Sequence, residues 1–435
     1  MKISSLYIKN FRNIVEKDFH FNTQFNVIIG KNGRGKSTLL HALRVAAGAY
    51  FLGIPEVKRR HIQNDEIRIT NANIMLEHRP VVVKATGILG DEQVTWKRRI
   101  LSESNITTTS LKDIGTIKNI SQAKYKRMQE EQTDQLDLPV IAYFGTDRVH
   151  GVGRNHANGG ATQRIGRQIY KEGYRNWYNM RSSTYQYRKW LQTYDVLNAT
   201  GRTYNGNKEL FFETVKTACP FIEHIQFVGQ ELWLNVILDG ITSDVLPLTL
   251  HSDGIITYVE MVAELAYRVL VLNGYKQANA MAETSGIVLI DEIDIHLHPS
   301  WQRHVVHDLK TAFPNLQFIV TTHSPFIVQS LKNDELLNLD LNEAYSGVEN
   351  DPLLYSLEEI AAKEMNVGES LENVERSQEF LEMQKAAAEF FELVEQADDP
   401  KAIDLAKAKL DQLSIRFSHD PVFVAQLTAE LPPNV

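Results

Sequence analysis

A glycine-rich octapeptide at residues 30–37, GKNGRGKS, carries the clearest chemical signal in the sequence. Glycines at this spacing let backbone N–H groups turn inward around phosphate oxygens, and the N-terminus of a following helix adds positive dipole charge. At the end of this loop, Lys36 would reach the β- and γ-phosphates of a nucleotide, and the Ser37 hydroxyl would bind Mg²⁺. The residues expected to contact ATP here are Asn32, Gly33, Gly35, Lys36, Ser37 and Thr38.

Two adjacent carboxylates, Asp291 and Glu292, end the apolar run 287–290 (IVLI). A carboxylate at the carboxyl end of a neighbouring strand is where a nucleotide-bound Mg²⁺ needs a ligand, and we expect Asp291 to be that ligand together with Ser37. Glu292 is then placed to accept a proton from the attacking water or to orient it. Without the glycine loop, an apolar strand that ends in acids would be equally compatible with a structural role.

Two further segments carry weaker signals. His323 follows the apolar run 316–321 and could donate a hydrogen bond to a γ-phosphate oxygen, although a histidine after a strand is more often structural. Ser252 and Gly254 lie at the start of a predicted helix, where a serine and a glycine can form a second phosphate-binding surface. The alternative interpretation of this second segment is a simple helix cap.

These residues need strands and helices to bring them together. Short apolar runs, which are typical of buried strands, occur at residues 25–29, 139–144, 286–290 and 316–321. Helices are predicted at residues 38–49, 123–134 and 254–272. A strand, a phosphate loop and a helix in immediate succession predict an α/β fold, whose ligands bind beyond the carboxyl ends of the strands.

The composition of the 435 residues, with 43% apolar and 23% charged, is that of a globular chain. No stretch approaches 18 apolar residues, so we expect no membrane association. The formal charge of −8 argues against a surface that coats nucleic acid everywhere, but it leaves room for a local basic patch. A single cysteine, Cys219, excludes an internal disulfide and indicates a reducing compartment, so we expect a cytoplasmic protein.

The order of the four motifs resembles that of the ATP-binding-cassette (ABC) ATPases, in the soluble branch that contains SMC, RecF and OLD proteins. Residues 30–37 match Walker A and 287–292 match Walker B with its catalytic glutamate; Ser252 and Gly254 lie at the signature motif, and His323 at the switch histidine. Arg12, within the segment NFRN, resembles the N-terminal motif of that branch near the nucleotide. The amino-acid sequence of 138–148 (LPVIAYFGTDR) is similar to that of stand-alone defence ATPases, and of the Septu antiphage family in particular.

This resemblance implies a fold and a division into domains. The fold would be an ABC-type P-loop ATPase head, a mixed sheet with flanking helices, with a helical insert and an all-helical, acidic C-terminal extension. The implied units are ATPase lobe I with Walker A, the helical insert, ATPase lobe II with the other three motifs, and the C-terminal extension, at residues 1–150, 151–215, 216–345 and 346–435.

The resemblance also implies a mechanism and partners. Two subunits would form a homodimer across two ATPs, and Ser252 of each would contact the ATP of the other; higher assembly stays open. The partner would be a separate HNH endonuclease that the ATPase regulates, and the chain would not itself be a nuclease. The sequence departs from the family at Asp253 and Ile255 of the signature, and at 145–148 (GTDR), where a glutamine that links the lobes is expected.

A basic and aromatic segment, 164–189, supports a different function. Arginines interleaved with aromatic rings can hold phosphates and stack on bases, which favours direct DNA contact by a RecF-like repair ATPase. The alternative is an amphipathic helix whose Tyr170, Tyr174 and Trp177 form a core stripe below a solvated basic face. A third possibility is docking of an acidic partner surface.

Overall fold

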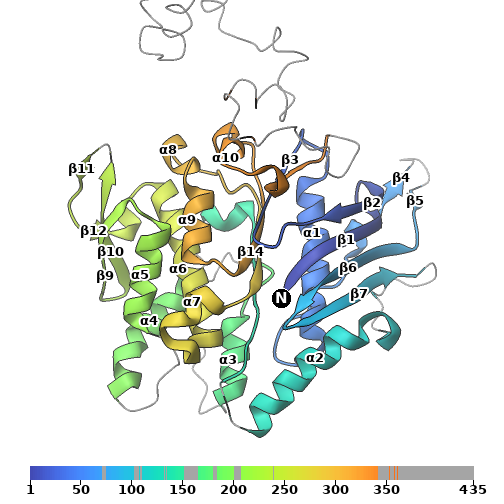
Figure 1. The fold of residues 1–435 in the computed structure, drawn as a ribbon, viewed down its shortest axis with the longest axis horizontal. Helices are drawn as coiled ribbons and strands as arrows, with labels where there is room; N and C mark the ends of the chain where they lie inside the picture. Colours follow the sequence, from blue (N-terminus) through green and yellow to red (C-terminus); the bar gives the residue numbers. More distant parts are fainter. Residues whose placement is uncertain are drawn as a thin grey trace, which may run out of the picture. The chain divides into compact units, whose positions relative to one another are not determined.

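The computed structural model divides into two units, Met1–Met365 and Asn366–Val435, and the second lies outside the described residues. Figure 1 shows the fold of the first. The described residues are 1–340 without 71–74, 102–106, 108–109, 132, 134, 151–164, 180–183, 200–206 and 239, together with 352, 357 and 360. Nearly all of the C-terminal extension expected at 346–435 is therefore outside the described residues, and it stays a prediction.

A five-stranded parallel sheet forms the centre of the fold, in the order β15-β3-β14-β13-β8. Its strands are β3 (Phe25–Ile29), β8 (Val140–Phe144), β13 (Gly286–Ile290), β14 (Leu316–Thr321) and β15 (Leu336–Asn338). Every residue of β3, β8, β13 and β14 is buried, which agrees with their continuous apolar sequences. These four strands were predicted from the sequence, and the predicted α/β class is confirmed.

A second, antiparallel sheet of order β2-β1-β6-β7 belongs to the N-terminal half. Its strands are β1 (Lys2–Phe11), β2 (Ile14–His20), β6 (Val81–Leu89) and β7 (Glu92–Ile100). Helix α1 (Lys36–Ala47), which follows the phosphate loop, packs against strands of both sheets (Figure 1). Because it lies between two apolar surfaces, α1 is buried on almost every side.

The helix predicted at 123–134 begins earlier in the structure, as α2 (Leu111–Glu130), and packs against β7. Its first half buries Ile114 and Ile117, which lie three positions apart on one face. The predicted start was wrong because the residues next to these two, Gly115 and Thr116, dilute the apolar pattern.

The other half of the unit is mainly helical and surrounds α6 (Asp253–Asn273) (Figure 1). Helices α3, α4 and α5 each contact α6, and α9 contacts α5. The remaining helices and strands are α3 (Ile165–Gly173), α4 (Thr184–Ala199), α5 (Lys208–Ala218), α7 (Ala280–Glu283), α8 (Pro299–Gln302), α9 (Val305–Ala312), α10 (Pro325–Gln329), β4 (Ile69–Thr70), β5 (Leu76–Glu77), β9 (Ile222–Val228), β10 (Glu231–Leu238), β11 (Ile241–Thr242) and β12 (Leu246–Pro247).

The aromatic residues of segment 164–189 are mostly in the core. The side chains of Tyr170, Tyr174, Trp177 and Tyr187 are almost completely buried. The Tyr174 hydroxyl donates to the Pro139 carbonyl at 2.8 Å, and the rings of Tyr170 and Tyr174 stack on each other. These four side chains therefore cannot stack on bases in this conformation, and the core interpretation holds for them.

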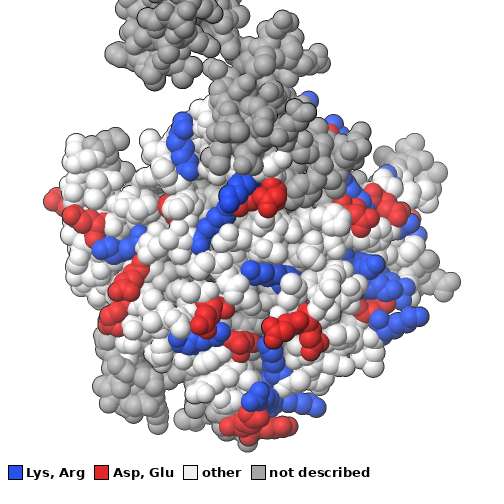
Figure 2. Space-filling model, in the orientation of Figure 1, with Lys and Arg blue, Asp and Glu red and all other residues white. Residues whose placement is uncertain are grey.

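The surface of the described part carries charges of both signs. Figure 2 shows Lys and Arg side chains interspersed with Asp and Glu on one face, without a large patch of one sign. Within the described residues, no helix is both long and apolar enough to cross a membrane.

A buried ion pair lies on α6, and its arginine also connects α6 to the end of α3. Arg268 and Glu264, one turn apart on α6, are fully buried and lie 3.0 Å apart. Arg268 also donates to the carbonyl oxygens of Gly173, the last residue of α3, at 2.7 Å and of Arg175 at 2.6 Å. Burial raises the pKa of Glu264 to about 8, and the neighbouring Arg268 acts in the opposite direction.

We expect Arg268→Met to lower the free energy of unfolding by about 3–5 kcal/mol, because it leaves Glu264 buried without a partner. Urea unfolding at pH 7 measures the loss. The double variant Arg268→Met/Glu264→Leu should recover part of it, since it removes the stranded carboxylate as well. A single variant that loses less than about 1 kcal/mol would contradict the role of the pair.

Candidate active site

The phosphate loop, residues 30–37, connects β3 to α1 and depends on three glycines in left-handed backbone conformations. Gly30, Gly33 and Gly35 have φ angles of 145°, 84° and 102°, which residues with a Cβ rarely adopt. Gly35 also lies against the Asn13 side chain, which would be only 3.2 Å from a Cβ at this position. The loop thus has a backbone shape suited to phosphate binding, which stays a prediction.

The Lys36 side chain bridges the two ends of this loop. Its ammonium group donates to the Gly30 carbonyl at 2.5 Å, and 8% of the residue is exposed. Burial lowers the pKa of Lys36, and the carboxylates of Asp340, Glu292 and Asp291 act in the opposite direction. A positive charge among carboxylates in a sheltered loop is suited to phosphate oxygens.

Ser37 and Asp291 come together although 254 residues separate them in sequence. The Ser37 hydroxyl donates to an Asp291 carboxylate oxygen at 3.3 Å, and that oxygen also accepts from the Thr321 hydroxyl at 2.7 Å. Strand β14 lies between β3 and β13, so its last residue, Thr321, is next to Asp291. A hydroxyl and a carboxylate at this separation fit Mg²⁺, which prefers oxygen ligands and usually takes few from the protein.

Glu292 directly follows Asp291 in a strained backbone conformation, with a φ of 49°. The Thr321 hydroxyl accepts from its backbone N–H at 2.7 Å. The Glu292 carboxylate has no hydrogen-bond or ion-pair partner among the residues that the structure describes, and the side chain is half-buried. A carboxylate with unengaged lone pairs can accept a proton from water.

Arg148 holds the backbone on which the two carboxylates are presented. Its guanidinium donates to the carbonyl oxygens of Asp291 and Glu292, at 2.6 Å each, and to that of Gly145 at 3.0 Å. Burial lowers the pKa of Arg148, and nearby carboxylates oppose the shift. The sequence motif 145–148 replaces the expected glutamine, but only the structure shows that Arg148 supports Walker B.

His323 follows β14 and is exposed, with its backbone N–H 3.4 Å from a carboxylate oxygen of Asp294. The same oxygen accepts from the Thr322 hydroxyl at 2.6 Å. Asp294 therefore ties the turn after β14 to the turn after Walker B. This position at the carboxyl edge of the sheet agrees with a switch histidine, while its contact with phosphate stays a prediction.

Ser252 and Gly254 begin α6. Ser252 is the exposed N-cap residue, and its hydroxyl makes no capping hydrogen bond. Gly254 is buried, and a Cβ at this position would lie 2.1 Å from the carbonyl oxygen of His296. The glycine is therefore required by the close approach of the loop after Walker B. In the described part of the chain, no hydrogen bond or ion pair joins Ser252 to the phosphate loop.

The turn between β1 and β2 lies beside the phosphate loop. Asn13 donates from its side chain to the Gly33 carbonyl at 2.8 Å. Arg12, which was expected near the nucleotide, has a φ of 49° and donates from its backbone to the Glu66 carbonyl at 2.8 Å. Arg12 therefore lies next to Asn13, the residue that contacts the phosphate loop.

Asp340 is a further acid at this site that the sequence did not reveal. Its carboxylate accepts from the Lys31 backbone N–H at 2.8 Å and pairs with Arg34 at 2.9 Å. It follows β15, whose pairing with β3 continues in a hydrogen bond from Leu339 to Ile29. Because β15 lies beside β3, Asp340 is brought to the phosphate loop from 309 residues away.

Comparisons with known proteins agree with this geometry. A family model described as an AAA domain matches residues 5–198. A second AAA-domain model, whose description also refers to AbiEii toxins of type IV toxin–antitoxin systems, matches residues 274–329. The two matches include the phosphate loop and the Walker B carboxylates, so the chain resembles AAA-type ATPases over these residues.

Three relatives match the chain over different shares of its length. Retron Vc95 probable ATPase of Vibrio cholerae serotype O1 biovar El Tor is 24% identical over 71% of this chain and 68% of its own length. Septu protein PtuA of Bacillus mycoides is 34% identical over 31% of this chain and 19% of its own. DNA replication and repair protein RecF of Psychromonas ingrahamii is 42% identical over only 14% of this chain and 16% of its own. The chain thus spans less than a fifth of the PtuA and RecF relatives.

We expect Arg148→Met to reduce ATP turnover by about ten- to a hundredfold, because Glu292 loses the contacts that fix its backbone. ATP affinity should change by less than about threefold, since the phosphate loop is untouched. Steady-state phosphate release and equilibrium nucleotide binding measure the two effects.

Arg127→Met is the matched control, because Arg127 is exposed and, among the described residues, forms an ion pair with Glu131, the C-cap residue of α2. This control should hydrolyse ATP at the wild-type rate. Equal rates in the two variants would refute a positioning role for Arg148.

Proposed function

We propose that the chain is the ATP-binding and ATP-hydrolysing subunit of an antiviral defence complex, and that its ATP-dependent dimerisation regulates a partner HNH endonuclease. The observation that carries the ATPase part is the convergence of Lys36, Ser37, Asp291 and Glu292 at one edge of the parallel sheet. The defence part is supported by similarity to the retron ATPase and to Septu PtuA.

Each residue of the site has a distinct task in hydrolysis. The N–H groups of the loop and Lys36 bind the phosphates of ATP, and Ser37 with Asp291 would hold Mg²⁺. The metal ion, when bound, neutralises charge on the phosphate oxygens. Glu292 accepts the proton of the attacking water, and His323 donates a hydrogen bond to the γ-phosphate. Arg148 and Thr321 keep the Walker B carboxylates in position.

A dimer would complete the site. Ser252 is exposed, its hydroxyl is not used in capping, and it makes no polar contact with the phosphate loop of its own chain. An exposed hydroxyl at a helix N-terminus suits a phosphate offered by a second subunit. Because only ATP presents a γ-phosphate, such a contact favours the dimer with ATP over the dimer with ADP.

The alternative function, a RecF-like ATPase that acts directly on DNA, has less support. The similarity to RecF covers a small part of the chain. The aromatic side chains Tyr170, Tyr174, Trp177 and Tyr187, which would have stacked on bases, are buried. In the proposed complex, the arginines of 164–189 could still contact DNA phosphates, but only to assist the partner nuclease.

We expect Lys36→Ala to abolish ATP binding, since it removes the cation that the phosphates require.

Glu292→Gln should keep ATP binding but reduce turnover by about a hundredfold or more, because the amide cannot accept the proton. With ATP, the second variant should accumulate as a dimer, which light scattering during size-exclusion chromatography would measure. Unchanged turnover in Glu292→Gln would refute its assignment as the base.

The partner is tested by purification of the chain with the products of its neighbouring genes. We expect an HNH endonuclease to co-purify, and nucleic-acid cleavage to require that subunit. The lone chain should show no cleavage with Mg²⁺ and ATP. Intrinsic cleavage by the lone chain, together with failure to bind any nuclease, would contradict the proposal while leaving the ATPase assignment intact.

A further inference from the structure

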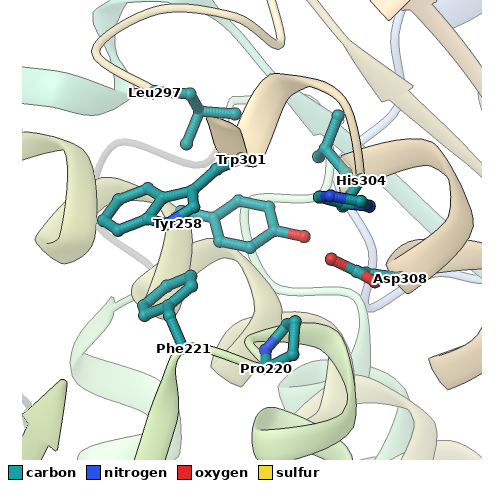
Figure 3. Close-up of a pocket in the computed structure, with 8 residues that line it drawn as sticks. Pro220, Phe221, Tyr258, Leu297, Trp301, His304 and Asp308 are labelled. Atoms are coloured by element: carbon teal, nitrogen blue, oxygen red, sulfur yellow. The ribbon is translucent and has the colours of Figure 1, made fainter. Parts of the chain in front are cut away.

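A small recess between α6, α8 and α9 lies away from the phosphate loop (Figure 3). Its walls are largely apolar and include the side chains of Phe221, Tyr258 and Trp301. The recess encloses about 50 Å³, which leaves room for a few water molecules but not for a cofactor or a substrate. It is therefore too small to be a ligand-binding site.

At the phosphate loop, Asp340 binds both ends of a turn. This turn, residues 31–34, is closed by a hydrogen bond from the Arg34 backbone N–H to the Lys31 carbonyl at 3.2 Å. At the first residue of the turn, the Lys31 backbone N–H donates to one Asp340 carboxylate oxygen at 2.8 Å. At the last residue, the Arg34 side chain forms an ion pair with the other oxygen at 2.9 Å. One carboxylate therefore bridges the turn from outside the loop.

The turn itself is exposed along its whole length, since all four of its residues are exposed. The Asp340 side chain, in contrast, is only 4% exposed. A backbone segment that has no core to pack against is ordered chiefly by contacts of this kind, because each fixed residue loses conformational entropy. The turn carries Asn32 and Gly33, two of the residues expected to contact ATP, so its order matters for binding.

The segment that carries Asp340 is fixed against the start of the loop. The Leu339 backbone N–H donates to the Ile29 carbonyl at 3.0 Å. The Asp340 backbone N–H donates to the Asn338 side-chain oxygen, also at 3.0 Å. A Cβ on Gly30 would lie 3.2 Å from the Leu339 Cβ and 3.7 Å from the Asp340 Cγ. Asp340 is thus anchored by β15 and its neighbours, and it can order the turn.

The charge of Asp340 acts against these contacts. Burial lowers the pKa of Lys36, and the Asp340 carboxylate acts in the opposite direction, which places its negative charge near the lysine that would bind phosphate. A carboxylate at this place repels the phosphates of ATP. By its charge alone, Asp340 would weaken ATP binding, whereas by its contacts it would strengthen binding.

We propose that Asp340 is a positioning residue for ATP binding, whose carboxylate holds the turn 31–34 in its binding shape before a nucleotide arrives. A turn that is already ordered loses less entropy when the phosphates bind, so the nucleotide binds more tightly. A carboxylate is suited to this task because its two oxygens accept from a backbone N–H and a guanidinium at once. The inference rests on the proposed function, to which it adds a residue from the far edge strand.

The first test is ATP binding and turnover by Asp340→Ala in the full chain. We expect the dissociation constant for ATP to rise at least about tenfold, because the variant must order the turn on binding. The rate at saturating ATP should fall by less than about threefold, since the turn contributes equally to the bound ground state and the transition state. Titration with a fluorescent ATP analogue and steady-state phosphate release measure the two quantities. A role in folding alone would not produce this split.

Asp340→Asn separates the contact from the charge. Its amide oxygen can still accept from the Lys31 backbone N–H, while the negative charge is removed. This variant should therefore bind ATP at least about threefold more tightly than Asp340→Ala.

Glu335→Ala is the matched control. Glu335 is also a buried carboxylate that accepts from a backbone N–H, that of Lys332 at 3.1 Å, and pairs with a cation, Lys310. It precedes β15, whereas Asp340 follows this strand. Its loss should change the affinity for ATP by less than about twofold, and thermal unfolding checks that all three variants are folded.

Hydrogen exchange of the wild type without nucleotide needs no variant. The Lys31 amide, which is bound to Asp340, should exchange at least about tenfold more slowly than the Asn32 amide at the exposed tip of the turn.

Three results would overturn the inference alone. The first is a folded Asp340→Ala that binds ATP as tightly as the wild type or more tightly, which would leave Asp340 as a repulsive charge. The second is an equal loss of affinity in Glu335→Ala, and the third is equal exchange of the two amides. Failure of the wild type to bind ATP would instead refute the proposed function, and this inference with it.

Discussion

The hydrogen-bonded order β3-β14-β13 is the constraint on which the site depends. Ser37 follows β3 by way of the phosphate loop, and Asp291 follows β13, so their separation of 3.3 Å is set by the one strand between them. Thr321, the last residue of that strand, serves both carboxylate residues: its hydroxyl donates to Asp291 and accepts from the Glu292 backbone. The proposed metal ligands and the proposed general base are thus positioned by main-chain pairing of the strands that carry them.

Two supports outside the central strands stabilise this arrangement. Arg148, after the edge strand β8, fixes the Walker B backbone from one side of the sheet. Asp340, after the opposite edge strand β15, binds the phosphate loop. Both are charged and mostly buried, so each is satisfied by backbone groups or by a countercharge, as burial requires. The proposed nucleotide site is therefore supported from the two edges of the same sheet.

The local parts of the site could be predicted from the sequence, and the long-range parts could not. The phosphate loop is recognisable because Gly33, Gly35 and Lys36 must follow one another at fixed spacing. Arg148 and Asp340 act on segments more than 140 residues away, so no spacing rule connects them with their partners. Gly254 has a local and a long-range role. The sequence predicted that it contacts phosphate, and the structure adds that the absence of a side chain here leaves room for the His296 carbonyl. The aromatic residues of 164–189 had two interpretations because a helical stripe looks the same whether it faces a core or a ligand.

The contact between Gly254 and His296 has a consequence for a dimer of this chain. A Cβ on Gly254 would lie 2.1 Å from the His296 carbonyl oxygen, so the start of α6 is in close backbone contact with the loop after Glu292. In the proposed dimer, Glu292 acts on a subunit's own ATP while Ser252 acts on the ATP of its neighbour. In such a dimer, a rearrangement at one nucleotide would alter the contact with the other through this packing, which would couple the two sites.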